Sequence, residues 1–139
     1  MGTYRFEEHT ADEKFIVWGK DLEDAFSTCV EAFYEIIIPE EKVQGKITKN
    51  IEVSARRLRS LLYDFLNELV FFYDDQDLLL RNVNQLKITQ DEKGYRLSAT
   101  LSGDTHYDYE VEMEIKNMTY SDMEIKQDAG VEITVVVDI

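Results

Sequence analysis

The sequence predicts one α+β domain over residues 1–139, a two-layer sandwich with a mainly antiparallel sheet and two principal helices at about 21–38 and 55–73. Three observations predict this class. Apolar residues recur at three-and-four spacing in two long stretches, as in amphipathic helices. Apolar and polar residues alternate in shorter stretches, as in strands. The length of 139 residues fits a single domain.

The two ends of the chain each predict strands. Residues 4–6 alternate apolar with polar side chains, and the apolar run 15–18 follows after the polar step at residues 9–12. Residues 131–137 alternate in the same way and predict a last strand that runs to the C-terminus. If these strands end near each other, the carboxylates of Asp12, Asp138 and the terminal Ile139 meet.

Such a meeting of carboxylates has two readings. Neighbouring carboxylates repel and raise one another's pKa unless a cation neutralises them, so the cluster favours a hard divalent ion or a shared proton. Charged residues in a turn and at a terminus are also commonly just solvated. The residues by themselves leave both readings open.

The first helix is predicted from a cap and a stripe. Asp21 is placed as the N-cap, with Asp24 three residues later in the manner of a capping box, and Pro39 marks the end. The apolar stripe between them is expected to be core; it comprises Leu22, Ala25, Phe26, Cys29, Val30, Phe33, Ile36 and Ile37.

A short strand at 47–53 precedes the second helix, for which Ser54 is the expected cap. The first turn of this helix contains Arg56, Arg57 and Arg59, an unfavourable choice at the positive end of the helix dipole. Bound acidic side chains, a protein partner or simple solvation would each account for it. Further along, Asp64 and Glu68 are four residues apart and share one helical face.

The second half of the chain predicts antiparallel strands. A hairpin is expected from residues 86–88 to 95–101, with Gly94 in the left-handed turn position. Residues 102–109 read as a surface loop, 111–115 as a strand and 118–125 as an extended segment. His9 and His106 are the only histidines, and their wide separation is more typical of structural residues than of metal ligands.

Composition narrows the partners. Asp and Glu outnumber Lys and Arg 29 to 15, giving a net charge of −14, whereas nucleic-acid affinity depends on Lys and Arg. We therefore expect no direct nucleic-acid binding, but attraction to divalent cations and basic protein surfaces. No apolar run is long enough for a membrane span, no secretory segment is visible, and the lone Cys29 predicts no internal disulfide, which together predict a cytoplasmic protein.

Motifs for autonomous catalysis are absent from the sequence. It contains no GxxxxGK phosphate loop, GxGxxG, HExxH, CxxC or GxSxG. The three aspartates at 74, 75 and 77 do not make a calcium loop, because Leu79 and Gln85 occupy the positions that require Gly and Glu. A nucleotide-using enzyme or a nucleophilic hydrolase is therefore disfavoured.

Four segments together resemble the archease family: residues 4–13 (YRFEEHTADE), 61–69 (LLYDFLNEL), 115–120 (IKNMTY) and 137–139 (VDI). The resemblance covers essentially the whole chain in order. It implies a non-catalytic activator of an RtcB-type tRNA-splicing RNA ligase, which promotes guanylylation and multiple turnover of the ligase and broadens its use of nucleoside triphosphates.

The resemblance also implies a site. Asp12, Asp138 and the carboxylate of Ile139 correspond to the family's metal ligands, and oxygen-only ligands favour calcium, with magnesium or manganese as further candidates, over zinc. Supporting or partner-contact positions are His9, Glu13, Asp64, Glu68, His106 and Lys116. Two alternatives remain open: a metal-dependent phosphoesterase, and a general chaperone or adaptor whose acids are only surface.

Overall fold

The computed structural model describes residues 2–9 and 12–139, without the side chains of residues 8 and 9. The strands are β1 (Thr3–His9), β2 (Asp12–Gly19), β3 (Ile47–Ala55), β4 (Leu78–Asp91), β5 (Gly94–Thr105), β6 (Asn117–Met118), β7 (Glu124–Lys126) and β8 (Val131–Asp138). The helices are α1 (Leu22–Ile37), α2 (Leu58–Gln76) and a short 3-10 helix, η1 (His106–Asp108).

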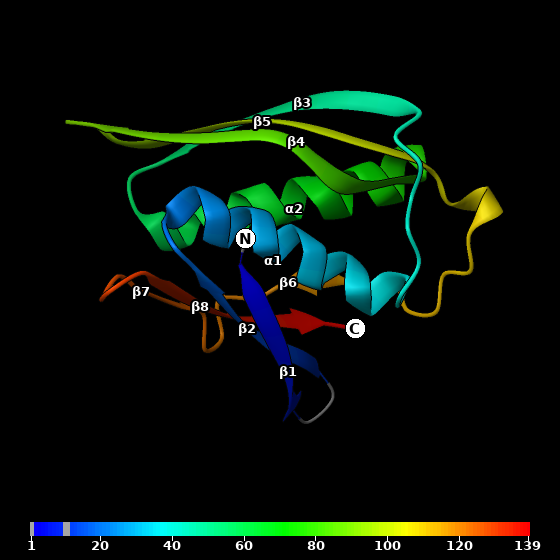
Figure 1. Cartoon of the computed structure of the whole chain (residues 1–139), viewed down its shortest axis with the longest axis horizontal. Helices are drawn as coiled ribbons and strands as arrows, with labels where there is room; N and C mark the ends of the chain where they lie inside the picture. Colours follow the sequence, from blue (N-terminus) through cyan, green and yellow to red (C-terminus); the bar gives the residue numbers. More distant parts are fainter. Residues whose placement is uncertain (1, 10–11) are drawn as a thin grey trace.

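Two antiparallel sheets lie on opposite sides of the two long helices (Figure 1). One sheet has the strand order β1-β2-β8-β6, with β7 also paired to β8, and the other has the order β3-β5-β4. The α+β class, the antiparallel pairing and the two principal helices are confirmed. The strands form two sheets instead of the single predicted one. Each long helix packs on both sheets: α1 contacts β2 and β4, and α2 contacts β3 and β6.

The burial of α1 follows from this arrangement. A helix between two sheets is covered on both sides, and the buried side chains accordingly extend beyond the predicted stripe to Thr28, Ala32 and Tyr34. The cap is confirmed, since the Asp21 carboxylate accepts the Asp24 N–H at 2.8 Å. Burial also raises the pKa of the Cys29 thiol, which packs as a protonated, apolar side chain.

The start of α2 corrects one prediction. Ser54 is not the cap, because Ser54 and Ala55 still pair with Arg96 and Tyr95 in the β3–β5 ladder. The helix begins only at Leu58, with Arg57 as an N-cap residue that makes no side-chain cap hydrogen bond. The ladder thus delays the helix beyond the predicted start at 55 and leaves its first turn without an acidic residue.

Two predictions for residues 102–115 are wrong. Residues 102–105 belong to β5, where Asp104 is buried; its carboxylate accepts the Thr105 N–H at 2.9 Å and the Tyr109 hydroxyl at 3.1 Å. Desolvation acts to raise the pKa of Asp104, but these hydrogen bonds and the nearby Lys46 ammonium outweigh it and hold the pKa below its usual value. Residues 111–115 form no strand, since the Glu112 N–H donates to the carbonyl of Ile37 at the end of α1.

A buried hydroxyl joins the helical layer to β4. The Leu80 N–H donates to the Tyr34 hydroxyl at 3.0 Å, and Tyr34 is fully buried. We expect Tyr34→Phe to lower the free energy of unfolding by about 1–3 kcal/mol, because it strands a buried donor. Tyr107→Phe is the matched control, since the exposed Tyr107 hydroxyl donates to Asp77 in reach of water. Urea denaturation measures both, and equal losses would contradict the expectation.

Within the described residues, neither long helix combines the length and apolar character needed to cross a bilayer.

Candidate functional site

The end of the first sheet carries a transverse row of polar residues. Asp12 on β2 lies directly opposite Asp138 on β8, with His9 on β1 opposite Asp12 and Asn117 on β6 opposite Asp138. Directly opposed residues of an antiparallel pair have Cα atoms about 4.5–5.5 Å apart and side chains on one face. The expected approach of Asp12 and Asp138 is therefore confirmed by the register; Thr10 and Ala11 lie outside the described residues.

The two carboxylates lie on the face of the sheet that points away from the helices. Phe15 and Val135 are opposite each other and fully buried, and both are three positions from the acidic pair, so strand alternation turns Asp12 and Asp138 outward. Both aspartates are half-buried. The same alternation turns Glu13 to the other face, so the structure does not bring Glu13 together with Asp12.

The C-terminus is held beside this pair. The carbonyl of Asp138 accepts the Lys116 N–H at 2.8 Å, and the Ile139 side chain packs against the hydrophobic core. The terminal carboxylate follows the outward-facing Asp138 by one residue. Two opposed carboxylates repel across a ladder, and a third adjoining group strengthens the chemical case for a hard cation with oxygen ligands.

Among the residues that the structure describes, no group of three or more His, Cys, Asp or Glu side chains is placed to hold a metal ion. The predicted set contains only two such side chains, Asp12 and Asp138, with its third carboxylate supplied by the main chain. The donor set is all oxygen and within one cross-strand pair, which fits a calcium- or magnesium-type ion better than zinc. The metal site stays a prediction.

A groove of about 570 Å³ runs along α2, and we name it the α2 groove. It brings together three of the predicted supporting residues, Asp64, Glu68 and Lys116. Its remaining lining is Val53, Ser54, Asn67, Val70, Phe71, Asp74 and Asn117. Asn117 both lines the groove and pairs with Asp138, so the groove reaches the end of the sheet where the acidic pair lies.

Residues missed by the sequence analysis complete the groove. Phe71 is 50% exposed and places one apolar side chain among the acids of the groove. Asp64, Asn67, Phe71 and Asp74 follow helical three-and-four spacing, so their common stripe was readable from the sequence. Their partners across the groove, Lys116 and Asn117, were not.

His106 lies in a different cluster, at the C-terminal end of α2. The backbone N–H of His106 donates to the Asp77 carbonyl at 2.9 Å, and its ring Nε2 is 3.4 Å from the Asp77 carboxylate. The imidazole ring also contacts Tyr73 and Tyr107. Burial and the nearby Glu114 and Asp77 carboxylates raise the pKa of Tyr73. His106 thus holds the helix end and lines neither the row nor the groove. The side chain of His9 lies outside the described residues.

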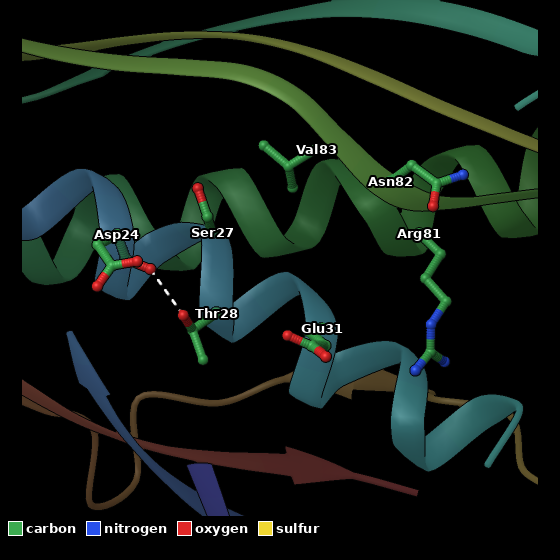
Figure 2. Close-up of a pocket in the computed structure, with 7 residues that line it drawn as sticks. All are labelled: Asp24, Ser27, Thr28, Glu31, Arg81, Asn82 and Val83. Carbon is green, nitrogen blue, oxygen red and sulfur yellow. Dashed lines mark hydrogen bonds between the residues drawn. The ribbon is translucent and has the colours of Figure 1, made fainter. Parts of the chain in front are cut away.

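A second cavity, of about 320 Å³, is lined by residues of α1 and β4 (Figure 2). Arg81 extends from β4 toward α1, where its guanidinium donates to the Glu35 carboxylate at 2.8 Å and to the Ile38 carbonyl at 3.3 Å. The Thr28 hydroxyl donates to the Asp24 carbonyl at 2.8 Å. The main cation of this cavity is therefore committed to holding α1 against β4, and none of the predicted site residues lines it.

The family model described as the Archease protein family (MTH1598/TM1083) matches residues 4–139. The chain belongs to the archease family. Two archeases illustrate the likeness: that of Methanosarcina mazei is 34% identical over 129 residues, covering 91% of this chain and 88% of its own. That of Pyrococcus abyssi is 36% identical over 129 residues, covering 91% and 90%.

Solved structures show the same archease fold. The solution structure of Methanobacterium thermoautotrophicum protein 1598 matches with a TM-score of 0.83 and 29% identity, covering 98% of both chains. The crystal structure of an archease from Thermotoga maritima, described as a possible chaperone, matches with a TM-score of 0.58 and 18% identity, covering 96% and 94%. The second likeness concerns the fold alone.

Proposed function

We propose that this archease is a non-catalytic protein activator of an RtcB-type tRNA-splicing RNA ligase in the cytoplasm. In this proposal it promotes guanylylation and multiple turnover of the ligase and broadens its use of nucleoside triphosphates. The observation that carries the proposal is the direct opposition of Asp12 and Asp138 on β2 and β8 at the exposed end of a sheet. The description of the Thermotoga maritima archease as a possible chaperone supports a role in assisting another protein.

The metal is part of the proposal. Asp12, Asp138 and the terminal carboxylate of Ile139 would hold a divalent cation, calcium in preference to magnesium or manganese, which supplies positive charge at the acidic tip. The fold of the chain positions these three ligands. The β2–β8 ladder aligns the two side chains, and the core contact of Ile139 limits the freedom of the terminal carboxylate. Rigid strands position ligands better than loops do.

The α2 groove is the proposed contact with the ligase. Asp64, Glu68 and Asp74 present negative charge to a basic protein surface, and Phe71 offers an apolar anchor between them. Acidic groups speed the approach to a basic partner, while the exposed Phe71 ring would add affinity once the partner covers it. The groove and the carboxylate row share Asn117, so one partner surface can cover both.

Multiple-turnover RNA ligation by an RtcB-type ligase from the same source tests the function. Wild type is expected to stimulate turnover, whereas Asp12→Ala and a chain lacking Asp138 and Ile139 are expected to lose the stimulation, because the cation ligands are gone. Asp64→Lys with Glu68→Lys is expected to raise the concentration needed for stimulation at least tenfold, because like charges then face the partner. Asp128→Lys with Glu40→Lys, at two exposed positions outside both sites, is the matched control.

The outcomes separate the alternatives. Circular dichroism establishes that each variant is folded before its activity is read. Absence of stimulation by wild type would refute the activator role. Stimulation that survives both tip changes would favour a general adaptor, and phosphoester turnover by the isolated protein, lost in Asp12→Ala, would favour a metal-dependent phosphoesterase.

A further inference from the structure

One end of this acidic molecule is basic. Five exposed side chains lie there, which we name the basic end: Arg56, Arg57, Arg59, Lys93 and Arg96. They are five of the 15 Lys and Arg residues in a chain of net charge −14. In Figure 1 the start of α2 and the β4–β5 turn lie at the left of the molecule, and the C-terminus lies on the right.

The fold, rather than the sequence, assembles the basic end. Ser54 and Ala55 at the end of β3 pair with Arg96 and Tyr95 of β5. The β4–β5 turn then packs on the segment that leads into α2, since a Cβ at Gly94 would lie only 2.7 Å from the Arg56 Cα. Residues about forty positions apart therefore share one surface.

A groove of about 260 Å³ marks this contact. Three cations line it, Arg56, Lys93 and Arg96, against one acid, Asp91. The Asp91 carboxylate accepts the backbone N–H of Lys93 at 2.8 Å and so shapes the turn. The charges around the groove sum to a positive value, unlike those of the α2 groove.

Arg59 extends the surface along the first turn of α2. Its guanidinium donates to the Tyr120 carbonyl at 3.4 Å and lies 5.8 Å from the Tyr120 ring, which stacks on Tyr63 at 4.1 Å. These contacts hold the arginine without neutralising it. The helix dipole adds positive potential, because the first turn has no acidic residue.

The five cations are available to a partner. Among the described residues, none of them forms an ion pair with an Asp or Glu side chain. Four of the five are arginines, whose planar guanidinium matches the geometry of phosphate oxygens. The exposed Ser54 lines the same groove, and its hydroxyl adds the kind of neutral donor that accompanies cations in contacts to a nucleic-acid backbone.

We propose that the basic end binds the phosphate backbone of single-stranded RNA. A phosphate backbone is favoured over an acidic protein because a protein interface needs apolar anchors, and of the strongly exposed large apolar side chains only Tyr120 lies here. The choice of RNA over DNA rests on the proposed function, in which the partner joins RNA. The chemistry of phosphate recognition does not rest on it.

The sequence-based expectation of no nucleic-acid contact came from the net charge of the whole chain, −14. The five cations of the basic end instead act locally. Charges separated by more than about 10 Å are largely screened at 0.1 M salt. Acids at the opposite end of the molecule therefore weaken, but do not cancel, attraction at the basic end. We expect binding that is weak, independent of base sequence and strongly dependent on salt.

Fluorescence anisotropy with a labelled twelve-nucleotide oligouridylate tests the inference on the isolated protein. Arg56→Gln with Arg96→Gln is expected to weaken binding at least tenfold at 50 mM KCl. The plot of the logarithm of the association constant against the logarithm of the salt concentration has a negative slope. The double variant should make this slope shallower by about 1.4, because it removes two phosphate contacts and each contact to a single strand contributes about 0.7. Lys42→Gln with Lys126→Gln, an equal change of charge elsewhere, should alter binding less than twofold.

Three results would overturn the inference: no measurable binding by wild type, equal loss in the Lys42/Lys126 control, or displacement of the RNA by poly-L-glutamate at equal charge. The last result would indicate an acidic protein partner. Thermal melting verifies that both double variants are folded. Because no ligase is present, this experiment can fail while ligase stimulation succeeds, and the reverse.

Discussion

Calcium is expected to raise the melting temperature of the wild-type protein by about 10 °C when its concentration is a hundred times the dissociation constant. At that ratio a ligand that binds only the native state adds about 2.7 kcal/mol to the free energy of unfolding. For a chain of 139 residues, each kcal/mol corresponds to roughly 4 °C. Differential scanning fluorimetry across a calcium titration measures the shift.

Asp138→Asn separates this effect from ordinary stability. In the ladder Asp138 lies directly opposite Asp12, and like charges in that position are destabilising. In the presence of a chelator, we therefore expect the free energy of unfolding of the variant to equal that of wild type or to exceed it by up to about 1 kcal/mol. In calcium it should lose the shift, because one of the carboxylate ligands is gone.

Asp128→Asn serves as the matched control, since Asp128 is exposed in a turn remote from Asp12. It should keep the full calcium shift. A wild-type protein that shows no shift with calcium, magnesium or manganese would refute the metal site while leaving the ligase assay to judge the activator role separately. A shift retained in Asp138→Asn would place the ion elsewhere.

Gly103→Ala is expected to destabilise the fold by at least about 3 kcal/mol, at or beyond the upper end of ordinary overpacking. A Cβ at this position would lie 1.7 Å from the Leu79 carbonyl oxygen and 2.6 Å from its carbonyl carbon. Both are backbone atoms of a fully buried residue in β4. The strand cannot yield as a flexible side chain would, so β4 must separate from β5.

Gly45→Ala provides the comparison. The nearest atom to a Cβ there is the Ser102 Oγ at 2.8 Å, a side-chain atom that can rotate away. We expect a loss of less than about 1 kcal/mol, within the range of most surface changes. Urea denaturation of the two variants checks the pair, and a Gly103→Ala protein as stable as Gly45→Ala would show that β4 adapts at little cost.

Local patterns predicted much of the fold because they depend on local physics. The stripe and cap of α1 located that helix to within a residue at each end, and the alternation at 131–137 located β8. Predictions failed where long-range contacts prevailed. The β3–β5 ladder delayed α2 past Ser54, the β4–β5 pairing absorbed residues 102–105 into a strand, and a hydrogen bond to α1 kept residues 111–115 out of one.

The sequence by itself determined the candidate chemistry of this archease: an aspartate beside a strand, an aspartate and a carboxylate at the chain end, and a family pattern linking them. Only the tertiary structure decided the register that sets Asp12 against Asp138, the groove that joins Asp64 to Lys116, and the surface that joins Arg56 to Arg96. The physical reason is that periodicity specifies which face a residue occupies, whereas the partner across that face is chosen by the packing of the whole chain.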